Sequence, residues 1–471
     1  MVASFLVFLA LIVAVGISSS FKSRATKHDY YLASSSVPPW LVGLSAVATN
    51  NSGYMFIGVI GYTYSTGLAA FWLMIGWLLG DLIASFVVHG RVRKAAQETG
   101  EASYVGLLSV WGGSRYLVWQ RVGALIALLF LMAYTSAQLV AGSKALHVLF
   151  EWPIWTGAVI GAVIVALYCM AGGIRASIWT DAAQSIVMIG SMAVLLVVAV
   201  SNLGGLTAAQ QSLQSIDGYM DWLPQGLALP GLAGLGLFIL GWAFAGFSVI
   251  GQPHVMVRFM TLNSVNNLMR MRLWYYLWFT AFYFMATAVG LLSRVYLSDT
   301  ASFDAELALP TMAVELLPPV MVGLIIAGIF AATMSTADSL VLSCSAAVTH
   351  DLLPQNIEKP ALLKAMTVVI TAAALVWALL NEQSVFSLVI FSWSALGAAF
   401  GALLLIWCFG GRPSQNLALL VSLSGLITAL AWRWFGLHSA VYEGLPGISV
   451  GLLIYTIATI STRVKPKTIT N

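Results

Sequence analysis

The chain has 471 residues, of which 60% are apolar and only 8% charged, and its formal net charge is +4 at pH 7. Because soluble domains carry about 25% charged residues, this composition and the mean hydropathy of +0.92 exclude an ordinary soluble enzyme and a disordered chain. Long continuous apolar runs favour helices over a transmembrane barrel. The expected fold class is an all-α polytopic membrane protein in a lipid bilayer, and the small positive charge gives no reason to expect nucleic acid.

The apolar runs divide into membrane spans. A helix that crosses about 30 Å of hydrocarbon needs about 20 apolar residues, and charge clusters and Gly/Pro loops set the boundaries. The first run lacks the basic start of a signal peptide and is interpreted as a retained span. Thirteen spans are predicted, at 2–20, 38–63, 67–90, 117–146, 153–171, 176–201, 229–252, 272–295, 319–347, 361–381, 385–409, 415–435 and 445–462.

The distribution of charge orients these spans. With the N-terminus outside and the C-terminus in the cytoplasm of a cell inner or plasma membrane, all but three of the 21 Lys and Arg residues lie on cytoplasmic segments or span ends. The exceptions are Lys144, Arg294 and Arg433. Acidic residues show the opposite bias, since the outer side holds Glu151, Asp217, Asp221, Asp299, Asp304, Glu306, Glu315, Glu382 and Glu443.

Two predicted spans contain poor helix formers. The second span carries ATNNSG at 48–53, where small polar side chains compete for backbone hydrogen bonds and glycine costs about 1 kcal/mol relative to alanine. The seventh carries AGFSVIGQP at 245–253, where proline removes a helical donor. The two interruptions lie five spans apart. If each belongs to a repeat of five spans, the second repeat is inverted in the membrane, because five is an odd number of crossings. This pattern favours a transporter built from inverted repeats, although close helix packing by small residues is an alternative.

This interpretation divides a single transporter domain, 1–471, into five parts. Residues 1–37 form a peripheral first helix and loop, 38–201 the first repeat, 202–228 an extracellular loop, 229–409 the second repeat and 410–471 peripheral C-terminal helices.

Three carboxylates, those of Asp81, Asp181 and Asp338, lie within predicted spans, where each costs about 3 kcal/mol or more. Asp338 shares a helical face with Ser335 and Ser339, since their spacing is i, i+3, i+4. Hydroxyl and carboxylate oxygens suit a hard cation, and an unwound stretch at 48–53 would add carbonyls. The alternative is that the hydroxyls bond to the preceding helical turn.

No sequence motif favours catalysis. The chain lacks a G-x-S-x-G turn, a nucleotide-binding Gly-Lys-Ser/Thr loop and a His-Glu-x-x-His pair. Its three cysteines show no paired spacing. We therefore expect a non-enzymatic transporter without an organic cofactor, driven by an ion gradient or by the gradient of its solute.

Five ordered stretches resemble the sodium/solute symporter family, most closely in pattern the bacterial sodium/proline permeases. The resemblance implies a LeuT-like 5+5 inverted repeat with about thirteen helices, alternating access and sodium-coupled import, with sodium, a small solute and lipid as partners and a single chain able to function. The stretches are ATNNSGYMFIG (48–58), AGGIRASIWTDAAQ (171–184), GQPHVMVRFM (251–260), IFAATMSTADS (329–339) and SWSALGAAFGA (392–402).

The resemblance also implies the binding residues. Sodium is expected at the carbonyls of Ala48, Asn51 and Ala332 and the side chains of Ser335 and Thr336, and a second sodium at Asp181, Ser335, Asp338 and Ser339. Proline permeases usually carry an aspartate where this chain has Asn50. The substrate site is expected to include Asn50, Ser52, Tyr134, Gln138, Phe247, Ser248, Pro253 and Trp393.

A small zwitterionic amino acid such as proline is the expected solute. The N-terminus of a half-helix can bind its carboxylate. We expect no arginine inside the membrane region that could bind a larger acid. One alternative is a proton-coupled symporter that uses Asp181 and Asp338. Another is a membrane sensor with vestigial transport, which usually has a signalling domain after the last span. Only about nine residues follow Thr462, so we do not expect one.

Overall fold

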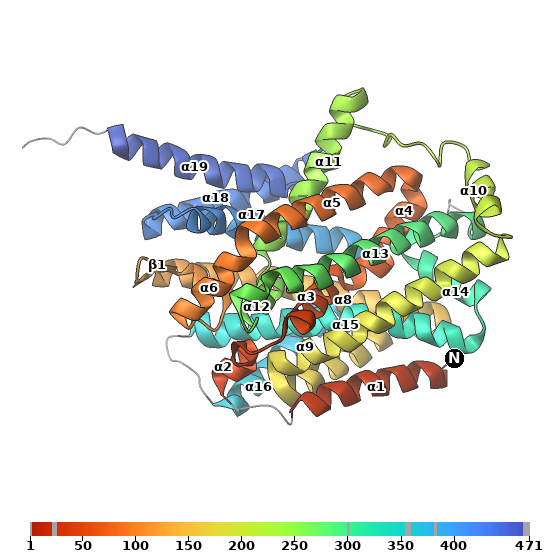
Figure 1. The fold of residues 1–471 in the computed structure, drawn as a ribbon, viewed down its shortest axis with the longest axis horizontal. Coiled ribbons are helices and arrows are strands. Elements are labelled where there is room, and N and C mark those ends of the chain that lie inside the picture. The colour runs from red at the N-terminus through yellow and green to blue at the C-terminus, as the bar shows by residue number, and fades with distance from the viewer. Residues whose placement is uncertain (1, 21–25, 299–301, 354–358, 381–383, 465–471) are drawn as a thin grey trace, which may run out of the picture.

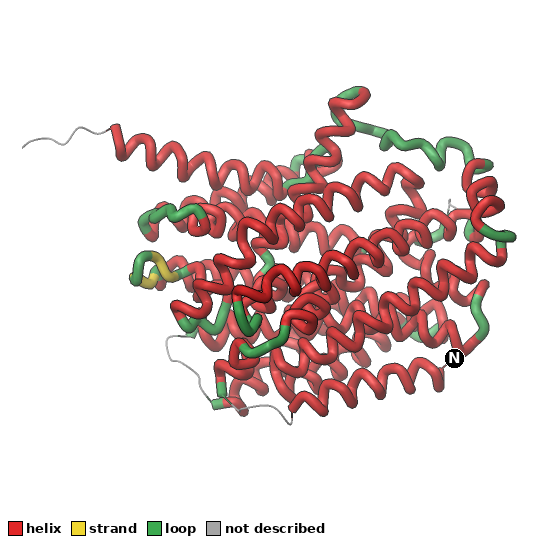
Figure 2. The backbone as a smooth tube through the Cα atoms, viewed as in Figure 1, coloured by secondary structure: helices red, strands yellow, loops and turns green. Residues whose placement is uncertain are grey.

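A computed structural model describes residues 2–20, 26–298, 302–353, 359–380 and 384–464. Within these ranges the chain is a bundle of long helices that run along the long axis of the molecule (Figures 1 and 2). The described strands are β1 (Val110–Trp111) and β2 (Ser114–Arg115), which form a short antiparallel hairpin. The helical backbone satisfies its own hydrogen bonds, which is the requirement for crossing hydrocarbon.

The helices follow the predicted spans to within a few residues. The segment predicted as the first repeat contains α3 (Pro39–Gly53), η2 (Tyr54–Val59), α4 (Ile60–Thr66), α5 (Phe71–Ala84), η4 (Ser85–His89), α6 (Gly90–Thr99), α7 (Tyr104–Leu108), α8 (Leu117–Phe150) and α9 (Ile154–Asn202). The segment predicted as the second contains α11 (Gly231–Phe247), η5 (Ser248–Gly251), α12 (Pro253–Met260), α13 (Leu268–Tyr296), η7 (Ala305–Leu307), α14 (Ala308–Leu316), α15 (Pro319–Ala346), η8 (Ala347–Leu352), α16 (Pro360–Leu380) and α17 (Val385–Cys408).

The remaining helices lie outside these two segments. They are α1 (Val2–Ser20), α2 (Lys27–Leu32), α10 (Leu206–Gln214), α18 (Gln415–Trp434) and α19 (Gly444–Val464). The predicted extracellular loop at 202–228 thus contains a short helix, α10, which the composition did not indicate. The boundaries of the five predicted parts stay a prediction.

The helices break at both predicted places. At the end of α3, Ser52 leaves helical geometry with φ 48° and ψ −177°. Between η5 and α12, Gln252 is extended, with φ −96° and ψ 100°, and Pro253 starts the next helix. A further break separates the fifth and sixth predicted spans inside α9, at Gly173 with φ 57°. A side chain at Gly173 would also meet the carbonyl of Tyr30 at 2.4 Å, so glycine is required there on two grounds.

The number of membrane crossings stays a prediction. Ten helices in the described part of the chain are long and apolar enough to cross a membrane, and two shorter apolar helices cover 2–16 and 154–167. The longest of the ten, Pro39–Thr99, spans 61 residues and changes direction at Gly67, whose φ is 75°. The ten helices, the two shorter helices and the extra crossing that the reversal at Gly67 would add sum to the thirteen predicted spans.

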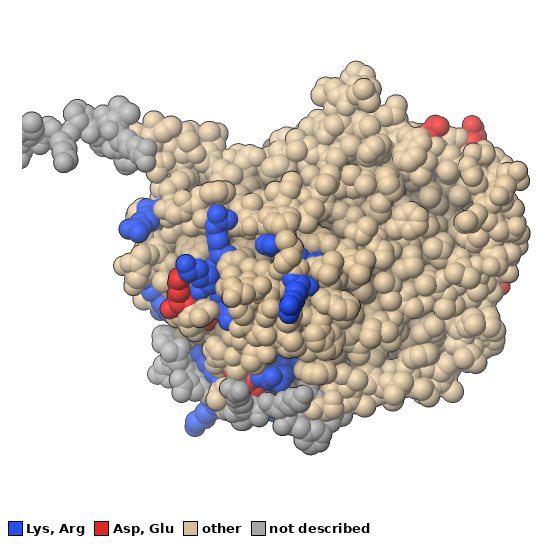
Figure 3. All heavy atoms as spheres, viewed as in Figure 1, with Lys and Arg blue, Asp and Glu red and all other residues tan. Residues whose placement is uncertain are grey.

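Charge is distributed unevenly along the bundle (Figure 3). Lys and Arg gather at the end where α6, α12 and β1 lie, whereas the charged atoms visible at the opposite end, near α10 and α14, are acidic. Of the acidic residues assigned to the outer side, Asp299 and Glu382 lie outside the described residues. The first described residues of α1 lie at the acidic end, and α19 runs to the basic end (Figure 1).

Candidate cation and solute sites

The break in α3 lies against α15. The Ser335 hydroxyl is 3.3 Å from the Ala48 carbonyl oxygen and 3.0 Å from that of Ala332. The Thr336 hydroxyl donates to the Thr49 carbonyl at 2.9 Å and lies 3.3 Å from that of Ala332. All of these residues are completely buried. We call Ala48, Thr49, Ala332, Ser335 and Thr336 the sodium cluster, because carbonyl and hydroxyl oxygens are the ligands that hard cations prefer.

The cluster resembles the predicted sodium site, with one difference in the carbonyls. The carbonyl of Asn51 accepts a hydrogen bond from the amide of Tyr54, and its side-chain amide donates to the Val47 carbonyl at 2.8 Å. The carbonyl that meets Thr336 is instead that of Thr49. The sequence located the break but could not give the helical phase at which its carbonyls turn toward α15.

Local strain and close approach hold this geometry. The φ and ψ of Ser52 fall in a region that is almost restricted to glycine and costs about 1 to 3 kcal/mol. The next residue, Gly53, packs so closely on α15 that an added Cβ would lie 2.5 Å from the Cγ2 of Thr333. Its amide donates to the side-chain oxygen of Gln138 at 2.8 Å. Strain of this kind persists where the surrounding structure enforces it, and it often marks a functional site.

One turn toward the basic end lies a second buried group, which we call the carboxylate cluster. It contains Asp181, Asp338 and the guanidinium of Arg258, with exposed fractions of 0%, 0% and 1%. Arg258 Nη2 lies 3.2 Å from Asp181 Oδ2. The hydroxyls around these charges belong to Ser45, Thr49, Ser177 and Ser339.

Arg258 corrects the expectation that no arginine is embedded in the membrane region. Sequence reasoning placed it at a cytoplasmic span end, because the seventh span was expected to finish near Pro253. In the structure Pro253 starts a new buried helix, α12, which carries Arg258 inward. The available signal was the pair of intramembrane carboxylates, since buried charges need a partner.

Three of the predicted substrate residues meet beside the break in α3. The Tyr134 hydroxyl donates to Ser52 Oγ at 3.2 Å, and the Gln138 side-chain oxygen accepts from the amide of Gly53. The other end of the Gln138 amide, Nε2, is buried without a hydrogen-bond partner among the described residues. A buried amide donor without a partner is costly, and it marks a position where a ligand atom would be stabilised.

Trp393 of α17 links these residues to the second break. Its ring lies 6.4 Å from that of Tyr134 and 5.6 Å from that of Trp77, and its indole N–H donates to the Ala245 carbonyl at 2.7 Å. Gln252, in the break, donates to the Trp393 carbonyl at 2.8 Å. His254 packs edge-on to Tyr134 at 5.4 Å. We call Ser52, Tyr134, Gln138 and Trp393 the solute cluster; sequence reasoning did not identify Gln252 or His254.

The other four predicted substrate residues have different surroundings. The Ser248 hydroxyl donates to the Phe244 carbonyl at 2.7 Å, and the Phe247 ring lies 6.0 Å from that of Phe244. Pro253 lines a small cavity toward the basic end of the molecule.

Asn50 points to a third buried carboxylate. Its side-chain amide donates to Asp81 at 3.0 Å and to the hydroxyl of Tyr275 at 2.5 Å. Tyr275 and Tyr276 donate to the same carboxylate at 3.0 Å and 2.6 Å. Asp81, whose partners the sequence did not identify, thus ties α3 to α5 and α13.

Comparison with known protein families gives a match across most of the chain, including the broken helix and the sodium cluster. The model of the Sodium:solute symporter family matches residues 30–425. The chain belongs to this family. Its members are transporters, which agrees with the absence of catalytic motifs noted above.

Curated relatives align over almost their whole length. The sodium/proline symporter of Escherichia coli (strain K12) is 28% identical over 481 aligned residues, which cover 97% of this chain and 93% of the relative. The high-affinity proline transporter PutP of Bacillus subtilis (strain 168) is 28% identical, with 96% of each chain covered. The osmoregulated proline transporter OpuE of the same organism is 26% identical.

Solved structures share the fold. A Na+-coupled sialic acid symporter in a substrate-bound outward-open state superposes with a TM-score of 0.81 at 20% identity, covering 98% of this chain and 97% of its own. MhsT in complex with L-phenylalanine gives a TM-score of 0.57 at 14% identity, covering 90% and 98%. The LeuT-like fold predicted from the sequence is confirmed.

Proposed function

We propose that this protein imports a small zwitterionic amino acid together with sodium by alternating access, and that proline is the first solute to test. The observation that carries the proposal is the sodium cluster, in which the Ser335 and Thr336 hydroxyls of one helix face carbonyls released by the break in another. Sodium bound there would hold α3 against α15. The proline specificity of the curated relatives supports the choice of solute.

The solute cluster adjoins the sodium cluster through a single stretch of chain. Residues 48 and 49 offer carbonyls to α15, and Ser52 and Gly53 contact Tyr134 and Gln138. Sodium that fixes this stretch therefore fixes the shape that the solute meets, so sodium raises the affinity for solute. By linkage the solute raises the affinity for sodium equally. The Nε2 of Gln138, which has no hydrogen-bond partner among the described residues, is suited to donate to the solute carboxylate.

The sodium gradient and the membrane potential set the direction of transport, and the orientation of the chain sets which end of the molecule faces the outside. We place the acidic end outside and the basic end in the cytoplasm, according to the positive-inside rule and the distribution of charge in Figure 3. Each sodium ion that moves inward then contributes about 2.3 kcal/mol at a potential of about 100 mV, in addition to its concentration gradient.

The test is uptake of radiolabelled proline into proteoliposomes that contain the purified protein. We expect uptake driven by an inward sodium gradient, and its loss when potassium or choline replaces sodium. A panel of other amino acids and organic acids, measured in the same way, distinguishes a wrong solute from a wrong mechanism. Uptake that follows an imposed pH gradient and ignores sodium would refute sodium coupling in favour of proton coupling.

A further inference from the structure

The carboxylate cluster contains more negative than positive charge. The guanidinium of Arg258 pairs with Asp181, and Asp338 is joined to Arg258 through the hydroxyl of Ser177; all three charged groups are buried. Asp181 Oδ1 and Asp338 Oδ2 have no hydrogen-bond partner in the described part of the chain. A buried charge without compensation is strongly unfavourable. With both carboxylates ionised, the cluster is short of one positive charge, which a cation or a proton can supply.

The sodium cluster is placed to supply that charge. Thr49 belongs to both groups, because its carbonyl accepts from Thr336 while its hydroxyl lies 3.4 Å from Asp181 Oδ2 and 3.3 Å from the hydroxyl of Ser339. Low dielectric makes charges interact strongly over such short separations. One sodium ion in the sodium cluster, together with Arg258, would balance the two carboxylates.

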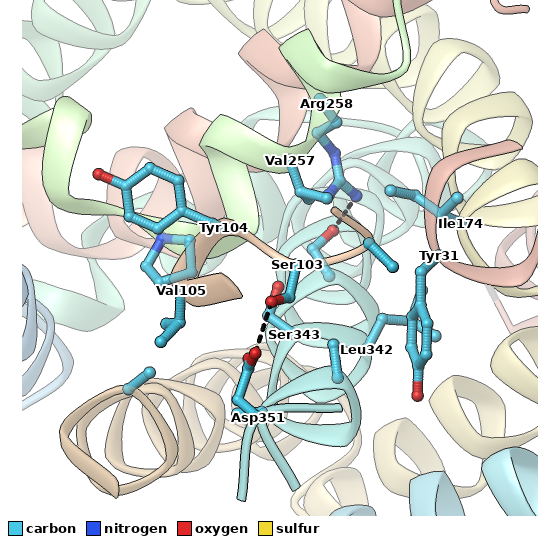
Figure 4. Close-up of a pocket in the computed structure, with 16 residues that line it drawn as sticks. Tyr31, Ser103, Tyr104, Val105, Ile174, Val257, Arg258, Leu342, Ser343 and Asp351 are labelled. Carbon is cyan, nitrogen blue, oxygen red and sulfur yellow. Dashed lines mark hydrogen bonds between the residues drawn. The ribbon is translucent and has the colours of Figure 1, made fainter. Parts of the chain in front are cut away.

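Arg258 itself occupies the place expected for a second sodium ion. Its Nη2 donates to the hydroxyls of Ser339 and Ser177, the latter at 2.8 Å, and it approaches Asp181. Ser177 in turn donates to Asp338 at 3.0 Å. Two of the residues that the family resemblance assigns to a second sodium, Asp181 and Ser339, thus contact a guanidinium, and Ser177 joins Asp338 to it. Figure 4 shows the Arg258 side chain pointing from α12 toward α15, the helix that carries Ser339.

We propose that Arg258 is a tethered cation that permanently takes the role of a second sodium ion, so that the protein binds and carries one sodium per solute. This inference deepens the proposed function and rests on its sodium coupling. Because Arg258 belongs to the short half of the broken seventh segment, it is held by the chain and contributes no net charge transport over a cycle. Arg258 thus determines how many sodium ions are coupled to each solute.

A small cavity beside the guanidinium gives ions a place to enter when the arginine is absent. It has a volume of about 30 Å³ and is lined by Pro253, Arg258, Ser339 and Asp351, among others. A buried water needs about 10 to 15 Å³ measured in this way, so the cavity is large enough for a water or a small ion, with Ser339 and Asp351 as polar residues in its wall. Toward the basic end, the Ser103 hydroxyl donates to Asp351 at 2.9 Å across its wall (Figure 4).

The test counts sodium ions bound to the purified full-length protein with ²²Na⁺, and repeats the count as the ratio of sodium to solute flux in proteoliposomes. We expect one bound ion for the wild type and two for Arg258→Met, whose sodium dependence should change from first to second order. Two matched variants serve as controls. Arg258→Lys keeps the charge, and Arg258→Met combined with Asp181→Asn restores the balance, so each should bind one ion.

Several outcomes would overturn the inference. One is a single bound sodium in Arg258→Met, as would occur if a proton took the vacant charge. Another is two bound ions in the wild type or in Arg258→Lys, and these two measurements do not depend on the folding of the methionine variant. A wild type that binds no sodium at all would instead refute the proposed function, so the two failures are distinguishable.

Discussion

The two hydroxyls of α15 are the residues on which sodium affinity should depend most directly. A polar contact to a charged group contributes about 1.5 to 3 kcal/mol, and each 1.4 kcal/mol is about tenfold in affinity. We therefore expect Ser335→Ala combined with Thr336→Ala to raise the sodium concentration for half-maximal uptake by about tenfold or more. Sodium titration of proline uptake measures this shift.

Ser345→Ala is the matched control, because Ser345 is a buried serine of the same helix whose hydroxyl contacts Tyr31 at 3.1 Å, away from the sodium cluster. Its sodium titration should overlay that of the wild type. An unchanged titration in the double variant would remove the sodium cluster from the mechanism.

Among helices, the interruptions were predictable because they depend on local chemistry. The sequence indicates both breaks, because the run ATNNSG at 48–53 and Pro253 disfavour a continuous helix. What each side chain meets after a break depends on helical phase and on packing against distant segments. That is why Asn50 was expected at the solute and lies against Asp81, and why the burial of Arg258 on α12 was missed.

Close packing at the α3 break gives a test at the scale of elements. Gly53 has an ordinary helical φ of −61°, so alanine is excluded by its neighbour Thr333 and not by its dihedral angles. Overpacking of this kind costs about 1 to 3 kcal/mol. We expect Gly53→Ala to lower the melting temperature and to reduce sodium-dependent uptake.

Adding Thr333→Ser to Gly53→Ala removes the clashing Cγ2 and should restore part of both quantities. The restoration should be partial because the new Cβ still lies 3.0 Å from the Gln138 side-chain oxygen and 3.1 Å from Ala141 Cβ. Equal losses in the single and the combined variants would show that the contact with Thr333 does not position the break.

At the scale of the whole molecule, apolar runs and two matched interruptions were sufficient to predict a helical membrane protein built from inverted repeats. The LeuT-like fold itself was predicted from the resemblance to the sodium/solute symporter family. The short elements α7, α10 and the β1–β2 hairpin were not predictable, because their apolar contacts form only once the long helices are packed. The sequence did not show either that the fifth and sixth predicted spans meet directly at a kink at Gly173, with no loop between them.

Orientation is the remaining property of the whole molecule that the charges predict, and cysteine labelling can test it. The chain's own cysteines, Cys169, Cys344 and Cys408, are first replaced by serine, which leaves no other thiol. We then expect Gln210→Cys, on exposed α10, to react with a membrane-impermeant maleimide on intact cells. Lys94→Cys, on the exposed face of α6, should react only after permeabilisation, because basic segments stay in the cytoplasm. The reverse pattern would contradict the predicted topology, and the acidic end would then face the cytoplasm.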